Sequence, residues 1–131
     1  MEDDLHAGKI RDYRDLKVWK HGMELATDIY LITRGFPKSE LFGLTSQMRR
    51  SSASIPANIA EGFGRQQRKS FVLFLRIAQG SLKELETHNE LARRVGLMEE
   101  ASSLRVAGSC EGIGKMLRAL IRKLDVKDGG E

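Results

Sequence analysis

Apolar side chains recur three or four positions apart along most of the chain, with polar and charged residues between them. That period places the apolar residues on one face of a helix and predicts four amphipathic helices in succession. The helices are expected from Tyr13 to a break at residues 35–37, from Ser39 to about Gly64, from Gln67 to Gly96, and, after a turn at residues 97–102, to Leu124. Because the connections are short, the pattern predicts an all-α, antiparallel up-down-up-down four-helix bundle.

Each helix has a stripe of apolar positions that we expect to face the core. The stripes are Leu16, Trp19, Met23, Ala26 and Tyr30 in the first helix; Leu44, Met48, Ser52, Ile55, Ile59 and Gly62 in the second; Phe71, Phe74, Leu75, Ala78, Leu82, Leu85 and Ala92 in the third; and Leu104, Ala107, Cys110, Ile113, Leu117, Leu120 and Leu124 in the fourth. For Trp19, Met23 and Tyr30 the core is favoured, and the alternative is a subunit or partner surface.

The second helix is rich in serine and alanine, so its neighbours can approach it closely. Pro56 lies inside it, where the ring removes one backbone donor and crowds the carbonyl of Ser52. We therefore expect a kink at Pro56, with nearby serine hydroxyls satisfying freed backbone groups.

Four ordered blocks of this sequence are similar to one known family. The main one is Leu44-Thr-Ser-Gln-Met-Arg-Arg-Ser51 followed by Ser54-Ile-Pro-Ala-Asn-Ile-Ala-Glu-Gly-Phe-Gly-Arg65, and the others are Leu16-Lys-Val-Trp19, Phe36-Pro37 and Ile77-Ala-Gln-Gly-Ser-Leu-Lys-Glu-Leu-Glu-Thr87. Over roughly residues 10 to 124 the chain resembles the four-helix-bundle proteins encoded in intervening sequences of bacterial 23S ribosomal RNA, which are related to accessory proteins of diversity-generating retroelements.

The resemblance implies an all-α bundle, a ring-shaped homo-oligomer that is often a pentamer, and a role with nucleic acid. It brings no established enzymatic activity. Many relatives have a serine at the position of Gln67 and an acidic residue at the position of Ser70, and these two residues form a capping box. This chain has neither, so the start of its third helix is expected to lack that cap.

The length of 131 residues fits one domain. We expect a flexible arm at residues 1–12, the bundle at 13–125 and a disordered tail at 126–131. No apolar run is long enough for a membrane span, and the acidic opening does not fit a secretory leader. With Cys110 as the single cysteine, a cytoplasmic location is the expectation.

Positive charge is concentrated in the middle of the chain. Residues 41–80 contain one acidic residue, Glu61, whereas both flanks are nearly balanced. The basic residues there are Arg49, Arg50, Arg65, Arg68, Lys69 and Arg76. They are either a footprint for nucleic-acid phosphates, with Phe63 as the one exposed stacking group, or they are solvated arginines or form salt bridges between subunits to acids such as Glu84, Glu86 and Glu90.

Asn58 and Glu61 form a polar pair within one turn, for which we favour a structural role across helices over a ligand contact. The three histidines and Cys110 share no metal-ligand spacing, and Gly62-Phe-Gly64 follows a helix and not a strand, so no metal, cofactor or catalytic residue is expected.

The sequence therefore favours a non-enzymatic homo-oligomeric bundle that contacts RNA or DNA through the basic residues. The alternative is a scaffold that docks another protein, such as a nucleic-acid enzyme.

Overall fold

The computed structural model describes the backbone of residues 10–129 and the side chains of residues 10–125. Its elements are a short 3₁₀ turn η1 (Tyr13–Asp15), α2 (Lys17–Thr33), a second turn η2 (Lys38–Glu40), α3 (Leu44–Gly64), α4 (Arg68–Arg94) and α5 (Glu100–Gly129). The described part of the chain is thus an all-α four-helix bundle, as the periodicity predicts.

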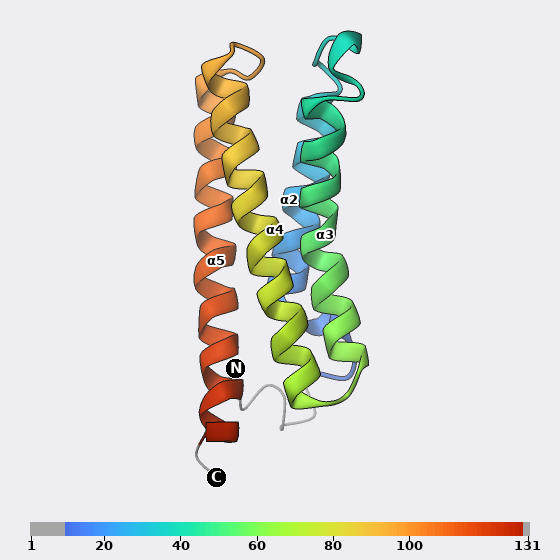
Figure 1. Ribbon diagram of the computed structural model, residues 1–131, viewed down its shortest axis with the longest axis vertical. Helices are drawn as coiled ribbons and strands as arrows, with labels where there is room; N and C mark the ends of the chain where they lie inside the picture. The colour runs from blue at the N-terminus through green and yellow to red at the C-terminus, as the bar shows by residue number, and fades with distance from the viewer. Residues whose placement is uncertain (1–9, 130–131) are drawn as a thin grey trace.

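The four helices lie side by side, and successive helices run in opposite directions along the long axis (Figure 1). Contacts join α2 to α3, α3 to α4, α4 to α5, and α5 back to α2. The core therefore lies along the centre of a four-helix ring, and the turn between α3 and α4 lies at the same end as the start of α2. No helix in residues 10–129 combines the length and the apolar character that crossing a membrane requires.

The predicted core stripe of α3 is confirmed from Met48 to Gly62, and its first member, Leu44, is half-buried against the core. Met48, Ser52, Ile55 and Ile59 are fully buried, and Gly62 is buried near the end of the helix. Two glycines allow close helix contacts here. A β-carbon built on Gly22 of α2 would lie 3.4 Å from the ring of Pro56, and one on Gly62 would lie 2.6 Å from Cβ of Phe74 on α4. These small residues set the short distances of α3 from its neighbours.

The helix α3 continues through Pro56 as one α-helix from Leu44 to Gly64. The hydroxyls of Ser51 and Ser52 donate to the carbonyl oxygens of Met48 and Arg49. They do not reach the carbonyl of Ser52, the group that lacks a donor because of Pro56. The expectation that serines satisfy that carbonyl is therefore wrong, and the kink at Pro56 stays a prediction.

The predicted core stripe of α2 is wrong in part. Met23 is 41% exposed and Tyr30 45% exposed, while Val18, Leu25 and Ile29 are buried. Both sets recur at steps of three and four, and they lie about 100° apart around the helix, so periodicity cannot choose between them. The contact of Gly22 with Pro56 turns the buried set, Val18, Leu25 and Ile29, inward. It leaves Met23 and Tyr30 beside α3 at the surface.

The start of α5 also differs from the prediction. Leu104 is 63% exposed and Ala107 is exposed, whereas Ser103 and Val106 are buried with Cys110. Val106 and Ser103 precede Cys110 by steps of four and then three residues, which keeps them on the same face of the helix. Leu104 precedes Cys110 by two steps of three residues, which places it about 120° away around the helix. The remaining predicted positions, from Cys110 to Leu124, are buried.

The described ends of the bundle differ slightly from the predicted limits. Ile10 packs against the core, and the carboxylate of Asp12 accepts a hydrogen bond from the backbone of Tyr13 at 2.8 Å, so this part of the predicted arm belongs to the bundle. Residues 1–9 of that arm lie outside the described residues. The helix α5 continues to Gly129, four residues beyond the predicted end of the bundle, and residues 130–131 of the predicted tail are outside the described residues.

Candidate nucleic-acid interface

The turn between α3 and α4 brings three of the predicted basic residues together. Arg65 closes α3 in a helical conformation, Gln66 has a positive φ of 60°, and Gln67 is extended at the N-cap of α4. A turn of only three residues therefore places Arg65 beside Arg68 and Lys69 at one end of the bundle. All three side chains are exposed.

The guanidinium group of Arg65 contacts Glu61 and the ring of Phe74. Its Nη2 lies 3.0 Å from Oε2 of Glu61, and its Cζ lies 5.0 Å from the centre of the Phe74 ring. The side chains of Arg65 and Glu61 are both exposed to solvent, and an exposed ion pair contributes about 0–1 kcal/mol to stability. A phosphate could therefore displace Glu61 at small cost and find the guanidinium already oriented.

The N-terminus of α4 lacks a side-chain cap. Gln67 makes no capping hydrogen bond, and the first turn contains no acidic residue but carries Arg68 and Lys69. The expectation of a missing capping box is thus confirmed. The N-terminus of a helix has a partial positive charge and directs N–H groups outward, which favours an anion at this point.

Arg11 joins this end from another part of the chain. With Arg68, Gln66, Gln67 and Phe63 it lines a shallow groove of about 260 Å³. Sequence reasoning missed Arg11, because the residue lies in the segment predicted to be a flexible arm. The signal that could have placed it is the N-cap aspartate at Asp12, which ends that segment.

Phe63 is not the exposed stacking group that we expected. It is half-buried and packs edge to face against Phe71, with the ring centres 5.8 Å apart. The ring helps join α3 to α4 and offers little free surface to a base.

The other three predicted basic residues lie away from this end. Arg49 donates from Nε to Oγ1 of Thr33 at 2.8 Å, and its guanidinium lies 4.7 Å from the centre of the Tyr30 ring. Arg76 pairs with Asp125 of α5 at 2.6 Å. Arg50 is exposed on α3, about 22 Å from Arg65 along the helix. The six predicted residues therefore do not form one patch.

Asn58 and Glu61 have separate partners. Asn58 donates from Nδ2 to the carbonyl oxygen of Ser54 at 2.8 Å and to its hydroxyl at 2.9 Å, and that hydroxyl lies 2.8 Å from the hydroxyl of Ser81 on α4. Within residues 10–125 the two members of the predicted pair make no hydrogen bond to each other. Asn58 thus contributes to the α3–α4 contact, and Glu61 pairs with Arg65.

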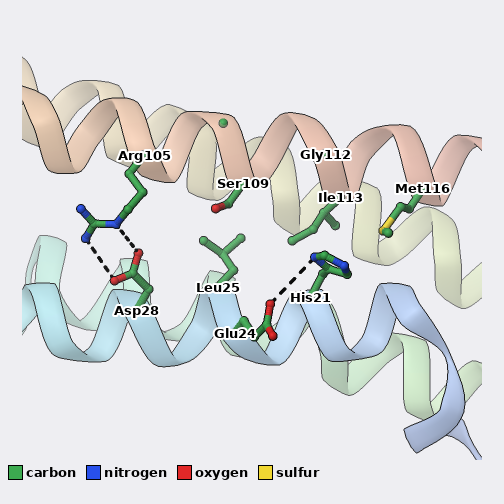
Figure 2. Close-up of a pocket in the computed structure, with 10 residues that line it drawn as sticks. His21, Glu24, Leu25, Asp28, Arg105, Ser109, Gly112, Ile113 and Met116 are labelled. Atoms are coloured by element: carbon green, nitrogen blue, oxygen red, sulfur yellow. Dashed lines mark hydrogen bonds and ion pairs between the residues drawn. The ribbon is translucent and has the colours of Figure 1, made fainter.

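A groove of about 520 Å³ lies between α2 and α5 (Figure 2). Arg105 of α5 reaches across to Asp28 of α2 with two hydrogen bonds of 3.2 and 3.3 Å, which raise the pKa of its guanidinium. His21 lies 3.9 Å from Glu24 on the same helix. In the part of the chain that the structure describes, no group of three or more His, Cys, Asp and Glu side chains is arranged to hold a metal ion.

These observations define a class of protein: a small helical bundle whose distinctive surface is a basic end built by one helix–helix turn. The family model of the 23S rRNA-intervening sequence protein matches residues 14–119, and the chain belongs to this family. The match includes the turn with Arg65, Arg68 and Lys69 but begins after Arg11. The resemblance expected from the sequence blocks is confirmed.

The fold is also similar to a solved crystal structure. That structure is of a protein of unknown function from the S23 ribosomal protein family of Bacteroides thetaiotaomicron; it is 28% identical, with a TM-score of 0.72, and the match covers 79% of this chain and 97% of that chain. The comparison with curated proteins found no match. Both the family and the neighbour support the fold, and neither supplies an activity.

Proposed function

We propose that this protein is a non-enzymatic, self-associating bundle that binds the phosphate backbone of RNA or DNA through its basic end, defined as Arg11, Arg65, Arg68 and Lys69. The observation that carries the proposal is the gathering of these side chains around the uncapped N-terminus of α4. Three of the four are arginines, whose planar guanidinium suits bidentate contact with phosphate.

The character of this end favours backbone contact over base reading. Phe63, the aromatic residue that lines the groove at this end together with Phe71, packs edge to face against Phe71 and leaves little ring surface for stacking of bases. Each subunit offers only a few cations, and assembly would add these patches together. In a ring of the pentameric kind that the resemblance implies, several weak contacts along one nucleic acid would give strong binding.

Neutralising the turn is expected to weaken binding to RNA and duplex DNA alike. The variant Arg65→Gln/Arg68→Gln/Lys69→Gln removes three cations, and the slope of log K against log salt should become shallower by about 2 to 3. Fluorescence anisotropy of a labelled structured RNA and a matched duplex, over a salt series, measures both quantities.

The matched control removes the same charge elsewhere. Lys115→Gln/Arg118→Gln/Arg122→Gln changes three exposed cations of α5 and should leave the slope nearly unchanged. Equal weakening by both triple variants would show that net charge, and not the basic end, governs binding.

The alternative function is a scaffold that docks a partner protein. The groove between α2 and α5 favours it, because Gly108 and Gly112 leave open space above α5 where a β-carbon would meet no atom within 4 Å. Absence of nucleic-acid binding by the unaltered protein at about 0.15 M salt would favour this scaffold role. A cytoplasmic location remains part of the proposal.

A further inference from the structure

The end of the bundle opposite to the basic end presents a projecting aromatic side chain. Phe42 lies in the connection between α2 and α3 and is 92% exposed, more than any other large apolar residue within residues 10–125, and its neighbour Leu41 is exposed as well. This connection and the turn between α4 and α5 lie at the same end of the molecule, away from the α3–α4 turn (Figure 1). Large apolar side chains that remain in water beside one another indicate a contact site.

The connection presents Phe42 on an ordered turn. The N–H of Gly43 donates to the carbonyl oxygen of Glu40 at 2.9 Å, and the N–H of Leu44 donates to the carboxylate of Glu40 at 3.2 Å. A β-carbon on Gly43 would lie 2.8 Å from that carboxylate, so the side chain of Glu40 packs against the backbone next to Phe42. Because the turn is already ordered, Phe42 can enter a partner without a large cost in conformational entropy.

The same end has a hollow between its two connections. The hollow has a volume of about 320 Å³, and its lining includes Ile32, Gly35, Phe36, Leu97, Met98 and Glu99. Most of these side chains are apolar, and the carboxylate of Glu99 is exposed. Phe42 of the same copy does not fill the hollow, since its ring is almost fully exposed. One end of the molecule therefore has both a projecting aromatic ring and an apolar hollow that can receive one.

Two-fold symmetry brings the ring and the hollow of two copies together. The helix contacts place α3 and α5 at opposite corners of the bundle. A two-fold axis that crosses the end from α2 to α4 therefore places the start of α3 in one copy over the start of α5 in the other. Phe42 precedes α3, and the hollow lies beside the start of α5, so two identical contacts form at once, as in other symmetric dimers.

The charges at this end match the same arrangement. Arg34 and Lys38 are exposed in the connection that contains Phe42, and Glu99 and Glu100 are exposed at the start of α5. Within residues 10–125 neither Lys38 nor Glu99 forms an ion pair. When Phe42 of one copy lies over the hollow of the other, the cations of its connection approach the acids at the start of α5 in the other copy.

We propose that two copies of this chain pair end to end, with Phe42 of each copy seated in the hollow of the other and Lys38 of each copy paired with Glu99 of the other. The contact uses the end of the bundle and leaves the sides of its helices free. Aromatic anchors in pockets dominate many interfaces, and each ring buries about 150–250 Å² here. The end of one bundle is small beside the roughly 800 Å² that each partner buries in a standard interface, so the pair is weak.

The pair has a basic end at each pole. The α3–α4 turn lies at the opposite end of the molecule from Phe42 (Figure 1), and the 27 residues of α4 span about 40 Å. The two basic ends therefore lie roughly 80 Å apart and face in opposite directions, which suits the bridging of two nucleic-acid segments. The bridging rests on the proposed function, whereas the end-to-end contact does not.

Sedimentation velocity without nucleic acid tests the contact. At about 100 μM protein, Phe42→Ser removes the projecting ring and Gly35→Leu fills the hollow, so each should halve the mass of the particle that the unaltered protein forms. Both positions are exposed, and circular dichroism checks that each variant is folded. Leu104→Ser removes an exposed apolar side chain outside the hollow and should leave the mass unchanged. An equal mass for the unaltered protein and Phe42→Ser overturns the proposal.

A charge exchange tests the register of the two copies. Lys38→Glu and Glu99→Lys should each lower the paired fraction, because each places like charges opposite one another. The double variant should restore pairing, since it exchanges the charges of both contacts together. If the single variants dissociate and the double variant does not recover, the assigned register is wrong.

Capture of a second RNA tests the bridging. Protein bound to an immobilised structured RNA should capture a fluorescent copy of the same RNA from solution. Phe42→Ser should bind the immobilised RNA with unchanged affinity and lose at least about tenfold of the capture, and undiminished capture would overturn the bridging role. If no RNA binds at about 0.15 M salt while the mass still halves in Phe42→Ser, the proposed function fails and the end-to-end contact stands.

Discussion

Cys110 is expected to react with iodoacetamide at least about a thousandfold more slowly in the folded protein than in the unfolded chain. Burial, supported by the nearby charge of Glu86, raises the pKa of its thiol from an ordinary value of about 9 to about 12. Since the thiolate is the reactive form, raising the pKa from about 9 to about 12 lowers the thiolate population at pH 8 about a thousandfold. Mass spectrometry of the alkylated protein, with and without denaturant, gives the ratio of the two rates.

Two relocated cysteines test the register of α5 in the same assay. In a Cys110→Ala background, Ser103→Cys should be protected because position 103 is buried, and Leu104→Cys should react at nearly the rate of the unfolded chain because position 104 is exposed. Protection at 104 with rapid reaction at 103 would restore the stripe that the sequence predicts and contradict the structure.

Replacing Gly62 with alanine is expected to lower the free energy of unfolding by about 1–3 kcal/mol, the usual cost of overpacking. The added β-carbon would lie 2.6 Å from Cβ of Phe74, 3.2 Å from Cδ1 of Phe71 and 3.3 Å from the carbonyl oxygen of Phe71. The Cβ of Phe74 and the carbonyl oxygen of Phe71 lie next to or on the backbone of α4, so a side-chain rotation cannot relieve these two contacts and the two helices must separate. Urea titration monitored by circular dichroism measures the loss.

Gly108→Ala provides the matched control, because its β-carbon would meet no atom within 4 Å. That variant should gain about 0.5–1 kcal/mol from the better helix propensity of alanine. If both glycine variants were stabilised alike, the close contact between α3 and α4 would not exist in solution. Since Gly62 lies three residues before Arg65, that contact also sets the position of the basic end.

Residues 44–65 show how far sequence reasoning reaches. The periodicity of Met48, Ile55 and Ile59 predicted their burial, and the small residues around them predicted close helix contacts, which Gly62 provides. Local pattern suffices here because the helix has a single apolar face. In α2 it does not suffice, since Val18, Leu25 and Ile29 compete with Trp19, Met23 and Tyr30 at the same spacing.

Only part of the candidate site could be predicted from the sequence. Arg65, Arg68 and Lys69 are neighbours along the chain, and a short turn keeps them together whatever the rest of the bundle does. The distant members depend on packing: Arg49 binds Thr33, Arg76 pairs with Asp125, and Arg11 joins the basic end although its surroundings in the sequence suggest an arm.

The sequence by itself determined the helical class, the family, the stripe of α3 and the excess of positive charge around the α3–α4 turn, because these follow from residue spacing and composition within single segments. Only the tertiary structure decided which face of α2 and which turn of α5 face inward, which arginines are used in helix–helix contacts, and which apolar residues remain at the surface. Those outcomes depend on the neighbouring helix, as when Gly22 meets Pro56, and spacing along one helix carries no information about its neighbour.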